Sequence, residues 1–302
     1  MVRTTSAALA AIPEPEAPVI ERVGVVGVGQ MGSGIAEVCA RVGLDVIVAD
    51  ENAEGLKRGR DRIAVSLKRA VKAGKLTEAD AEAALGRIRF TEDLQDFADR
   101  QFAVEAVVEV EEVKTAVLAK LDLILPEDAI LASNTSSIPI MRLGTATARP
   151  ANVVGVHFFN PVPVLKLVEV IPSLATSEDT KARAVAFVEQ LGKQPVVAQD
   201  RAGFVVNSLL IPYLLAAIRM AEGGFASAAD IDSGMVLGCA HPMGPLALSD
   251  LIGLDTVKLA AEAMYEEFKE PLYTPPALLL RMVEAGRLGR KTGRGFYEYP
   301  SV

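Results

Sequence analysis

The sequence predicts an α/β fold, in which a doubly wound parallel sheet domain over residues 19–200 precedes an all-helical domain over residues 201–302. In the first part, short β-branched runs without charge alternate with helical stretches, and this alternation is typical of parallel sheets with helical crossovers. After about residue 200 the apolar residues follow helical spacing, with no convincing strand before the last few residues. Half of the residues are hydrophobic and 23% are charged, which favours a folded globular chain.

Hydrophobic periodicity predicts the individual elements of the first domain. Residues 22–28, RVGVVGV, form an uncharged apolar run, as expected of a strand buried on both faces. In the helix that follows, apolar residues recur at i, i+3, i+4 and i+7, and Gly43 is placed to end it; they are Ile35, Val38, Cys39 and Val42. The other expected elements are a strand at 45–50, a charged helical segment at 53–86, strands at 102–108, 129–132 and 153–158, and a helix at 112–123.

Charge and hydropathy exclude two classes of partner. The net charge of −8 argues against a general nucleic-acid binder, which needs a basic face. The longest uncharged apolar run, 202–218, is shorter than the roughly 20 residues that cross a bilayer, and it contains Asn207 and Pro212. We therefore expect a buried helix there and no membrane association. No metal site is expected.

The first residues and the cysteines indicate in which cellular compartment the protein is expected. Residues 1–18 contain three prolines and no signal-peptide core, so we expect a flexible extension. Cys39 and Cys239 form no CxxC pair and suggest no disulfide framework, which favours a reducing compartment and a cytoplasmic location.

A glycine-rich turn predicts the cofactor. In GVGQMGSG, glycines 27, 29 and 32 have GxGxxG spacing between a strand and a helix, with Gln30 and Met31 inside the motif. Gly27 permits the tight turn, Gly29 lets a pyrophosphate approach the backbone, and Gly32 lets helix and strand pack closely. Asp50, at the end of the next strand, can accept hydrogen bonds from the adenosine ribose. These features predict a Rossmann-like NAD site, although basic neighbours that the sequence does not reveal would also admit NADP.

The stretch VGVHFFNPVPVLKLVEV places an imidazole and a carboxylate among apolar residues. In an extended VLKLVEV, Glu169 shares a face with Leu165 and Leu167, and a carboxylate on an apolar face is costly unless it is paired. A strand pair turning at the intervening prolines would bring Glu169 beside His157. A carboxylate that holds one ring nitrogen leaves the other as a base near neutral pH. The alternative for His157 alone is a satisfied core histidine.

Longer motifs make a family recognisable. LASNTSSI, GVHFFNPVPVLKLVEV, AGFVVNSLLIPYL, HPMGPLALSDLIGLD and GRKTGRGFYEY occur in order between about residues 21 and 299. Together they resemble the L-3-hydroxyacyl-CoA dehydrogenase family, most nearly its stand-alone 3-hydroxybutyryl-CoA dehydrogenases. The resemblance implies a role in fatty-acid or butanoate metabolism, with acetoacetyl-CoA and 3-hydroxybutyryl-CoA as the substrate pair.

The resemblance also implies roles for individual residues. His157 would be the general base and Glu169 its orienting partner, while Ser136 and Asn207 would hydrogen-bond the substrate oxygen. Positions near the cofactor are matched by Glu109, Lys114, Asn160 and Lys291. Val110 departs from the asparagine that is usual in the family. Without the family context, Ser136 could equally belong to an ordinary polar loop. Asn207 could instead form a structural hydrogen bond between helices.

Basic residues at 66–75 suggest how coenzyme A binds. Lys68, Lys72 and Lys75 are spaced as a helical stripe, and Ser66 and Lys72 match family positions that contact coenzyme A. The alternative is a solvated helix face. His241, among turn-forming residues, is expected to be structural. Glu105 is expected to be more buried than Glu109, with no role assigned.

Two rival functions are open at this stage. One is a dehydrogenase of free 3-hydroxy acids such as gulonate, which would not need the basic stripe. The other is a non-catalytic NAD-binding protein, against which the set of His157, Glu169, Ser136 and Asn207 argues. The apolar helical domain has more hydrophobic surface than about 100 residues can hide, so a homodimer through it is expected, as the family resemblance also implies.

Overall fold

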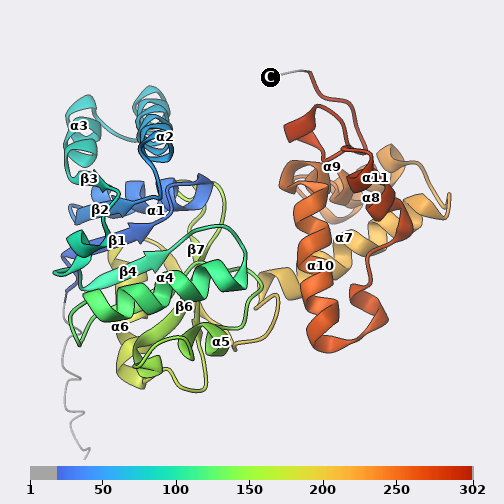
Figure 1. The fold of residues 1–302 in the computed structure, drawn as a ribbon. Coiled ribbons are helices and arrows are strands. Elements are labelled where there is room, and N and C mark those ends of the chain that lie inside the picture. The colour runs from blue at the N-terminus through green and yellow to red at the C-terminus, as the bar shows by residue number, and fades with distance from the viewer. Residues whose placement is uncertain (1–18, 301–302) are drawn as a thin grey trace, which may run out of the picture.

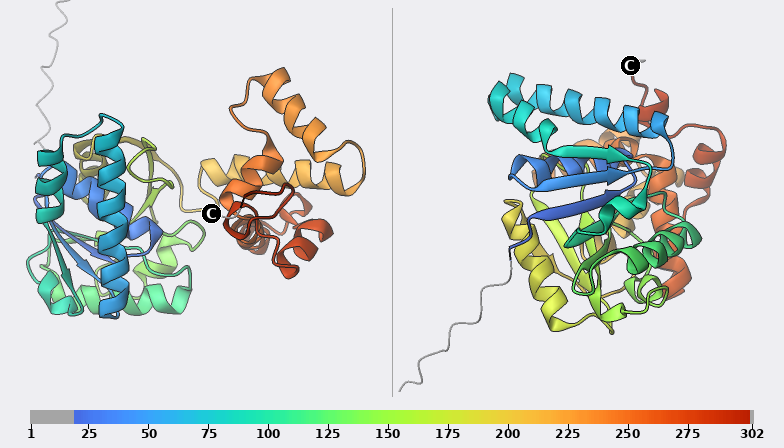
Figure 2. Two further views of the ribbon diagram at one scale, coloured as in Figure 1. Left: turned by 90° about the horizontal axis from the view of Figure 1, so that it is seen from above. Right: turned by 60° about the vertical axis from the view of Figure 1, so that its left-hand side comes forward.

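The computed structural model describes residues 19–300, so the predicted extension at 1–18 lies outside the described residues. The chain builds a sheet-containing part first and a helical part second, and the two lie side by side (Figure 1). The view from above shows the same division into two parts, joined near the start of the helical part (Figure 2, left). The predicted fold class, a sheet domain followed by helices, is confirmed.

One eight-stranded sheet forms the centre of the first part. Its strand order is β3-β2-β1-β4-β5-β6-β7-β8, and all neighbouring pairs are parallel except β6 and β7, which are antiparallel. The strands are β1 (Arg22–Val26), β2 (Asp45–Ala49), β3 (Ile88–Thr91), β4 (Phe102–Glu105), β5 (Ile130–Ser133), β6 (Val153–Phe158), β7 (Leu167–Pro172) and β8 (Gln194–Val197).

Helices cover both faces of this sheet. On one face, α1 and α6 enclose the apolar core with β-strand side chains, and α2 and α3 pack outside α1. On the other face, α4 and α5 enclose a second core. The helices are α1 (Gln30–Arg41), α2 (Ala53–Lys72), α3 (Glu78–Gly86), α4 (Glu111–Ile124), α5 (Ile140–Gly144) and α6 (Glu178–Gln190), with 3₁₀ turns η1 (Leu94–Phe97) and η2 (Pro150–Asn152).

The structure corrects two helix predictions. Val42 follows the end of α1 and is exposed, since Gly43, with φ of +98°, already turns the chain away. The segment expected to be helical at 53–86 consists of two helices, α2 and α3, and Gly74, with φ of +67°, helps to turn the chain between them. Lys75 lies in this turn, outside the predicted helical stripe.

The strand predictions were also incomplete. β3 and β8 were missed because each has four residues, and a charge in one and a proline in the other interrupt the apolar pattern. The strand expected at 102–108 ends at Glu105, since the chain turns into the loop that leads to α4. Leu165 precedes β7 and is exposed, so the alternation begins two residues later than predicted.

The second part is a helical unit with its own core. Its helices are α7 (Val206–Glu222), α8 (Ala228–Cys239), α9 (Pro245–Ile252), α10 (Leu254–Phe268) and α11 (Ala277–Glu284), with 3₁₀ turns η3 (Pro271–Tyr273) and η4 (Arg290–Thr292). The run expected as a buried helix at 202–218 enters its helix only at Val206, and although most of its apolar residues are buried or half-buried, Leu209 is 74% exposed. In the part of the chain that the structure describes, no helix is long and apolar enough to cross a membrane.

Candidate active site

The site lies where the strand order reverses. β1 is flanked by β2 on one side and by β4 on the other, and all three are parallel. Loops that leave the carboxyl ends of such strands separate and open a crevice for ligands. The glycine-rich turn follows β1, the loop with Glu109 follows β4, and the loop with Ser136 follows β5. His157 is near the same end of β6, so the predicted residues converge on one edge of the sheet.

Each glycine of the motif meets a different constraint. Gly27 has φ of +91°, and a Cβ there would lie 2.7 Å from the carbonyl oxygen of Ala106. A Cβ on Gly32 would lie 1.8 Å from the carbonyl oxygen of Gly27, so the helix cannot approach the turn with any larger residue. A Cβ on Gly29 would meet nothing within 4 Å. The protein itself therefore does not require glycine at 29, and this open position beside the start of α1 fits a pyrophosphate.

Asp50 ties the glycine-rich turn to the end of β2. One carboxylate oxygen accepts the N–H of Val28 at 2.9 Å, and the other accepts the N–H of Glu51 at 2.9 Å. The next residue is itself acidic, which disfavours a 2′-phosphate at this position. Nearby, Gln30 Nε2 donates to Asn160 Oδ1 at 3.0 Å, which joins the start of α1 to the loop after β6.

His157 and Glu169 meet as directly opposed residues of β6 and β7. His157 Nδ1 lies 2.7 Å from Glu169 Oε2, with both side chains buried. Glu169 Oε1 accepts the N–H groups of Val205 and Val206, each at 2.9 Å. Val205 is the N-cap of α7 and has no side-chain cap of its own, so the Glu169 carboxylate caps this helix. The imidazole is thereby fixed with Nδ1 as donor and Nε2 available as a base.

Aromatic rings and the start of α7 complete the surroundings of the histidine. The centroid of the Phe159 ring lies 4.5 Å from that of the imidazole, and the centroid of the Phe204 ring lies 5.5 Å from it. Asn207 is in the first turn of α7 and is half-buried. Among residues 19–300, no hydrogen bond to the protein is found for its side chain, which argues against the structural-amide alternative.

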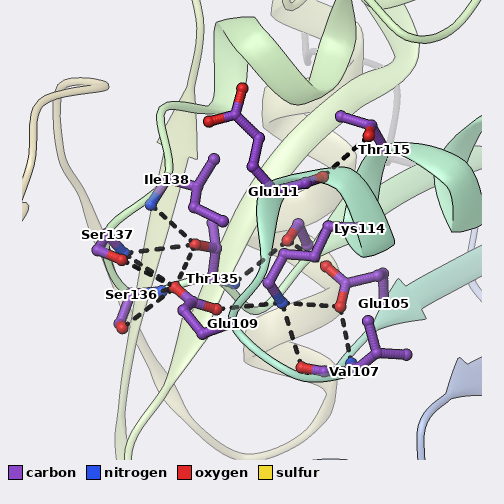
Figure 3. A network of polar contacts seen from close by, with 11 residues as sticks. Glu105, Val107, Glu109, Glu111, Lys114, Thr115, Thr135, Ser136, Ser137 and Ile138 are labelled. Atoms are coloured by element: carbon purple, nitrogen blue, oxygen red, sulfur yellow. Dashed lines mark hydrogen bonds and ion pairs between the residues drawn. The ribbon is translucent and has the colours of Figure 1, made fainter. Parts of the chain in front are cut away.

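Ser136 belongs to a loop that is held by Glu109 (Figure 3). Glu109 Oε1 accepts the N–H of Ser136 at 2.8 Å and the hydroxyl of Thr135 at 2.6 Å. Glu109 Oε2 pairs with the Lys114 ammonium at 3.1 Å. Burial alone would raise the pKa of Glu109, but Lys114 and the loop donors outweigh it and leave that pKa below its usual value. The carboxylate is therefore ionised at neutral pH.

Three predicted residues lie apart from this cluster. Ser66 and Lys72 are on α2, where Lys72 is exposed and Ser66 is partly buried. Lys291 is in η4, and its ammonium lies 2.6 Å from Asp255 in the helical part. Their contacts with coenzyme A and NAD remain predictions.

The structure also shows the surroundings of the other residues that the sequence analysis named. Val110 is the N-cap of α4 and provides no side-chain cap, whereas the asparagine usual in the family could. His241 Nδ1 lies 3.2 Å from the Tyr213 hydroxyl, and no acidic partner of its ring is found in the described part of the chain. Glu105 is fully buried and Glu109 is not, as predicted.

Sequence reasoning missed Asn134. Its Oδ1 accepts the N–H of Phe158 at 2.9 Å, so it ties the loop after β5 to the residue beside His157. The available signal was its place directly after a strand, at the edge where ligands bind.

Comparison with known proteins distinguishes the rival functions considered from the sequence. Residues 22–201 match "3-hydroxyacyl-CoA dehydrogenase, NAD binding domain", and residues 203–299 match "3-hydroxyacyl-CoA dehydrogenase, C-terminal domain". The chain belongs to the 3-hydroxyacyl-CoA dehydrogenase family. The resemblance noted from the sequence is confirmed, and so is NAD as the cofactor.

Individual members of the 3-hydroxyacyl-CoA dehydrogenase family are similar over nearly their whole length. The chain is 60% identical to 3-hydroxybutyryl-CoA dehydrogenase of Mycobacterium tuberculosis strain H37Rv, over 93% of this chain and 99% of that protein. The crystal structure of M. tuberculosis FadB2 superposes with a TM-score of 0.93 at 59% identity, over 94% of this chain and 100% of that one. The (S)-3-hydroxybutyryl-CoA dehydrogenase PaaH1 from Ralstonia eutropha gives a TM-score of 0.90 at 47% identity, with the same coverage.

Proposed function

We propose that the protein catalyses the reversible NAD-dependent oxidation of an L-3-hydroxyacyl-CoA, with 3-hydroxybutyryl-CoA as the preferred substrate. The observation that carries this proposal is the buried His157–Glu169 pair at the cofactor edge of the sheet. A relative that is 60% identical and bears the name 3-hydroxybutyryl-CoA dehydrogenase supports the short acyl chain.

In this mechanism His157 is the base. Nδ1 donates to Glu169, so Nε2 accepts the proton of the 3-hydroxyl group. The Glu169 carboxylate stabilises the imidazolium that forms. We assign Ser136 and Asn207 the task of holding the substrate oxygen, and orientation of this kind contributes much of the rate. When bound, NAD would supply the hydride acceptor for C3 of the substrate.

NAD is the cofactor that the nucleotide end of the site fits. Open space at Gly29 and the start of α1 suit the pyrophosphate, while Asp50 suits the ribose hydroxyls. Because Glu51 adds a second negative charge there, we propose that NADH is preferred over NADPH. Gln30, Met31, Glu109, Asn160 and Lys291 complete the proposed cofactor contacts. Lys114 is 1% exposed and its ammonium is occupied by Glu105, Glu109 and the Val107 carbonyl, so we propose that it acts on the cofactor side only through Glu109.

Kinetics with paired substrates test this function. Acetoacetyl-CoA should support NADH oxidation, and the free 3-keto acid should not, because it lacks the group that Ser66 and Lys72 are proposed to bind. Turnover of the free acid alone would favour the gulonate-type alternative, and no turnover with any acyl chain from C4 to C16 would favour a non-catalytic NAD-binding protein. In His157→Gln, turnover should fall by orders of magnitude while NADH still binds; a change of a few-fold would place the base elsewhere.

We further propose that the chain acts as a homodimer joined through its helical domain, which begins near residue 201. Large apolar side chains are exposed on α7, α8 and the turn between them: Leu209 at 74%, Leu237 at 84% and Phe225 at 81%. Exposed apolar surface of this kind is typical of an interface. Analytical ultracentrifugation at micromolar concentration tests it, and a monomer would contradict the proposal.

A cytoplasmic location is proposed as well. Cys39 and Cys239 are both free thiols, as expected in a reducing compartment. Fractionation of cells that produce the native chain, with detection by antibody, tests this proposal.

A further inference from the structure

A buried charge behind the active site has no part in the mechanism described so far. Glu105, the last residue of β4, is 0% exposed, and Lys114 on α4 is 1% exposed. The ammonium of Lys114 has three partners, equal to its number of donors: Glu105 Oε1 at 2.8 Å, Glu109 Oε2 at 3.1 Å and the carbonyl oxygen of Val107 at 3.4 Å. Lys114 therefore bridges one fully buried carboxylate and one that faces the site (Figure 3).

Glu105 is fixed far more firmly than Glu109. It extends from the middle of the sheet, its Oε1 also accepts the N–H of Val107 at 2.7 Å, and its Oε2 accepts the hydroxyl of Ser133 at 2.6 Å. Glu109, by contrast, is in a loop, and its side chain is 35% exposed. The network thus connects Glu105, on a rigid strand, through Lys114 to Glu109, in a loop.

The far end of this network is the loop that carries Ser136. Glu109 Oε1 is the meeting point of donors from three successive residues, Thr135, Ser136 and Ser137. The loop has no regular secondary structure; Asn134 ties its start to Phe158, and Glu109 holds the segment that carries Ser136. A movement of the Glu109 carboxylate would therefore move the Ser136 hydroxyl.

We propose that Glu105 is a positioning residue, which fixes Ser136 for the substrate oxygen through Lys114 and Glu109. A buried ion pair contributes little net stability, because desolvation offsets the attraction. In this protein the Glu105–Lys114 pair contributes orientation. The two carboxylates fix the position of the Lys114 ammonium, and the ammonium fixes the position of the Glu109 carboxylate. The inference rests on the proposed function, in which Ser136 contacts the substrate.

Glu105→Gln tests this with little change of shape. Glutamine can keep its oxygen toward Lys114 and the N–H of Val107, with its NH₂ group toward the Ser133 hydroxyl, but it removes the negative charge that balances Glu109 across Lys114. The ammonium is then drawn toward Glu109, and the loop shifts. Because displacements of about 1 Å can cost about a hundredfold in rate, we expect kcat with acetoacetyl-CoA to fall between about tenfold and a hundredfold. If Glu105→Gln does not fold, Ser133→Ala removes one support of the same carboxylate and should lower kcat in the same direction.

A double-mutant cycle separates positioning from general damage. In a Ser136→Ala background, Glu105→Gln should cost no more than about threefold further, because the residue through which it acts is already gone. The matched control is Asp122→Asn, which breaks a partly buried ion pair on α4, with Arg149 at 2.8 Å. This control should lower the melting temperature and leave kcat unchanged.

The outcomes distinguish the two proposals. If the wild type is active, two results would overturn the positioning role alone. In one, the losses of kcat caused by Glu105→Gln and by Ser136→Ala multiply in the double variant. In the other, Asp122→Asn loses as much kcat as Glu105→Gln. A wild type that is inactive with every acyl-CoA overturns the proposed function and this inference with it.

Discussion

Replacing Glu169 by glutamine perturbs the central pair of the site with the smallest change in shape. The carboxylate is fully buried, lies 2.7 Å from His157 Nδ1, and accepts the N–H groups of Val205 and Val206. Glutamine has to present its oxygen to those two N–H groups, so its NH₂ group faces the imidazole. The imidazole then keeps its proton on Nε2, the atom that has to accept one from the substrate.

The magnitude follows from the charge that is removed. Two unit charges about 4 Å apart attract by about 4 kcal/mol at an effective dielectric constant of about 20. Glu169 supplies this attraction only once His157 has become an imidazolium, so its loss raises the barrier to reaction more than it weakens binding. About 4 kcal/mol corresponds to about a thousandfold in rate. We therefore expect kcat to fall by about that factor, while the Kd for NADH changes by less than about threefold.

Steady-state NADH oxidation with acetoacetyl-CoA measures kcat, and fluorescence titration measures NADH binding. The matched control is Asp232→Asn. Asp232 is also buried and accepts two backbone N–H groups at a helix start, those of Leu246 and Ala247, but it is in the helical domain. The control should lose stability and keep its kcat. A loss of less than tenfold in Glu169→Gln, in folded protein, would refute the role assigned to the carboxylate.

Three further predictions test other parts of the structure. Gly29→Ala should keep the wild-type melting temperature and lose NADH affinity, whereas Gly32→Ala, with its Cβ 1.8 Å from a carbonyl oxygen, should lose stability as well; equal melting temperatures would contradict this. Burial raises the pKa of the Cys39 thiol to about 12, so alkylation followed by mass spectrometry should label it only after denaturation. Since the pKa of Glu109 is lowered in the folded state, its ionised form stabilises the protein fully above its usual value of 4.5, and this contribution is lost as the pH falls through the lower folded value. The difference in melting temperature between wild type and Glu109→Gln should therefore shrink below about pH 4.5; a constant difference would show that the charge contributes nothing.

The fold class and the approximate place of the site could be predicted from the sequence because they depend on local patterns. Alternating apolar runs and helices are sufficient for a doubly wound sheet, and the GxGxxG turn with Asp50 at the next strand end marks its cofactor edge. Strand alternation singled out Glu169 as a carboxylate that needs a partner. The turn at the prolines then made His157 the natural candidate.

Local sequence patterns could not predict the short strands at the edges of the sheet. β3 and β8 have four residues each, and pairing with a neighbouring strand stabilises them more than their own periodicity does. The end of α2 is different, because Gly74 is a local signal for it, as Gly43 is for the end of α1; that signal was overlooked, and Lys75 lies outside the stripe.

The interactions that orient the active site were decided by the tertiary structure alone. Glu169 caps α7 across the junction of the two parts, through N–H groups 36 and 37 residues away. Glu105, for which the sequence suggested burial and no role, pairs with Lys114, and through it supports the loop of Ser136. No local pattern predicts such contacts, because hydrogen bonds and ion pairs depend on which loops meet at the sheet edge. The sequence determines which side chains need partners, and the packing of the chain determines which partner each one receives.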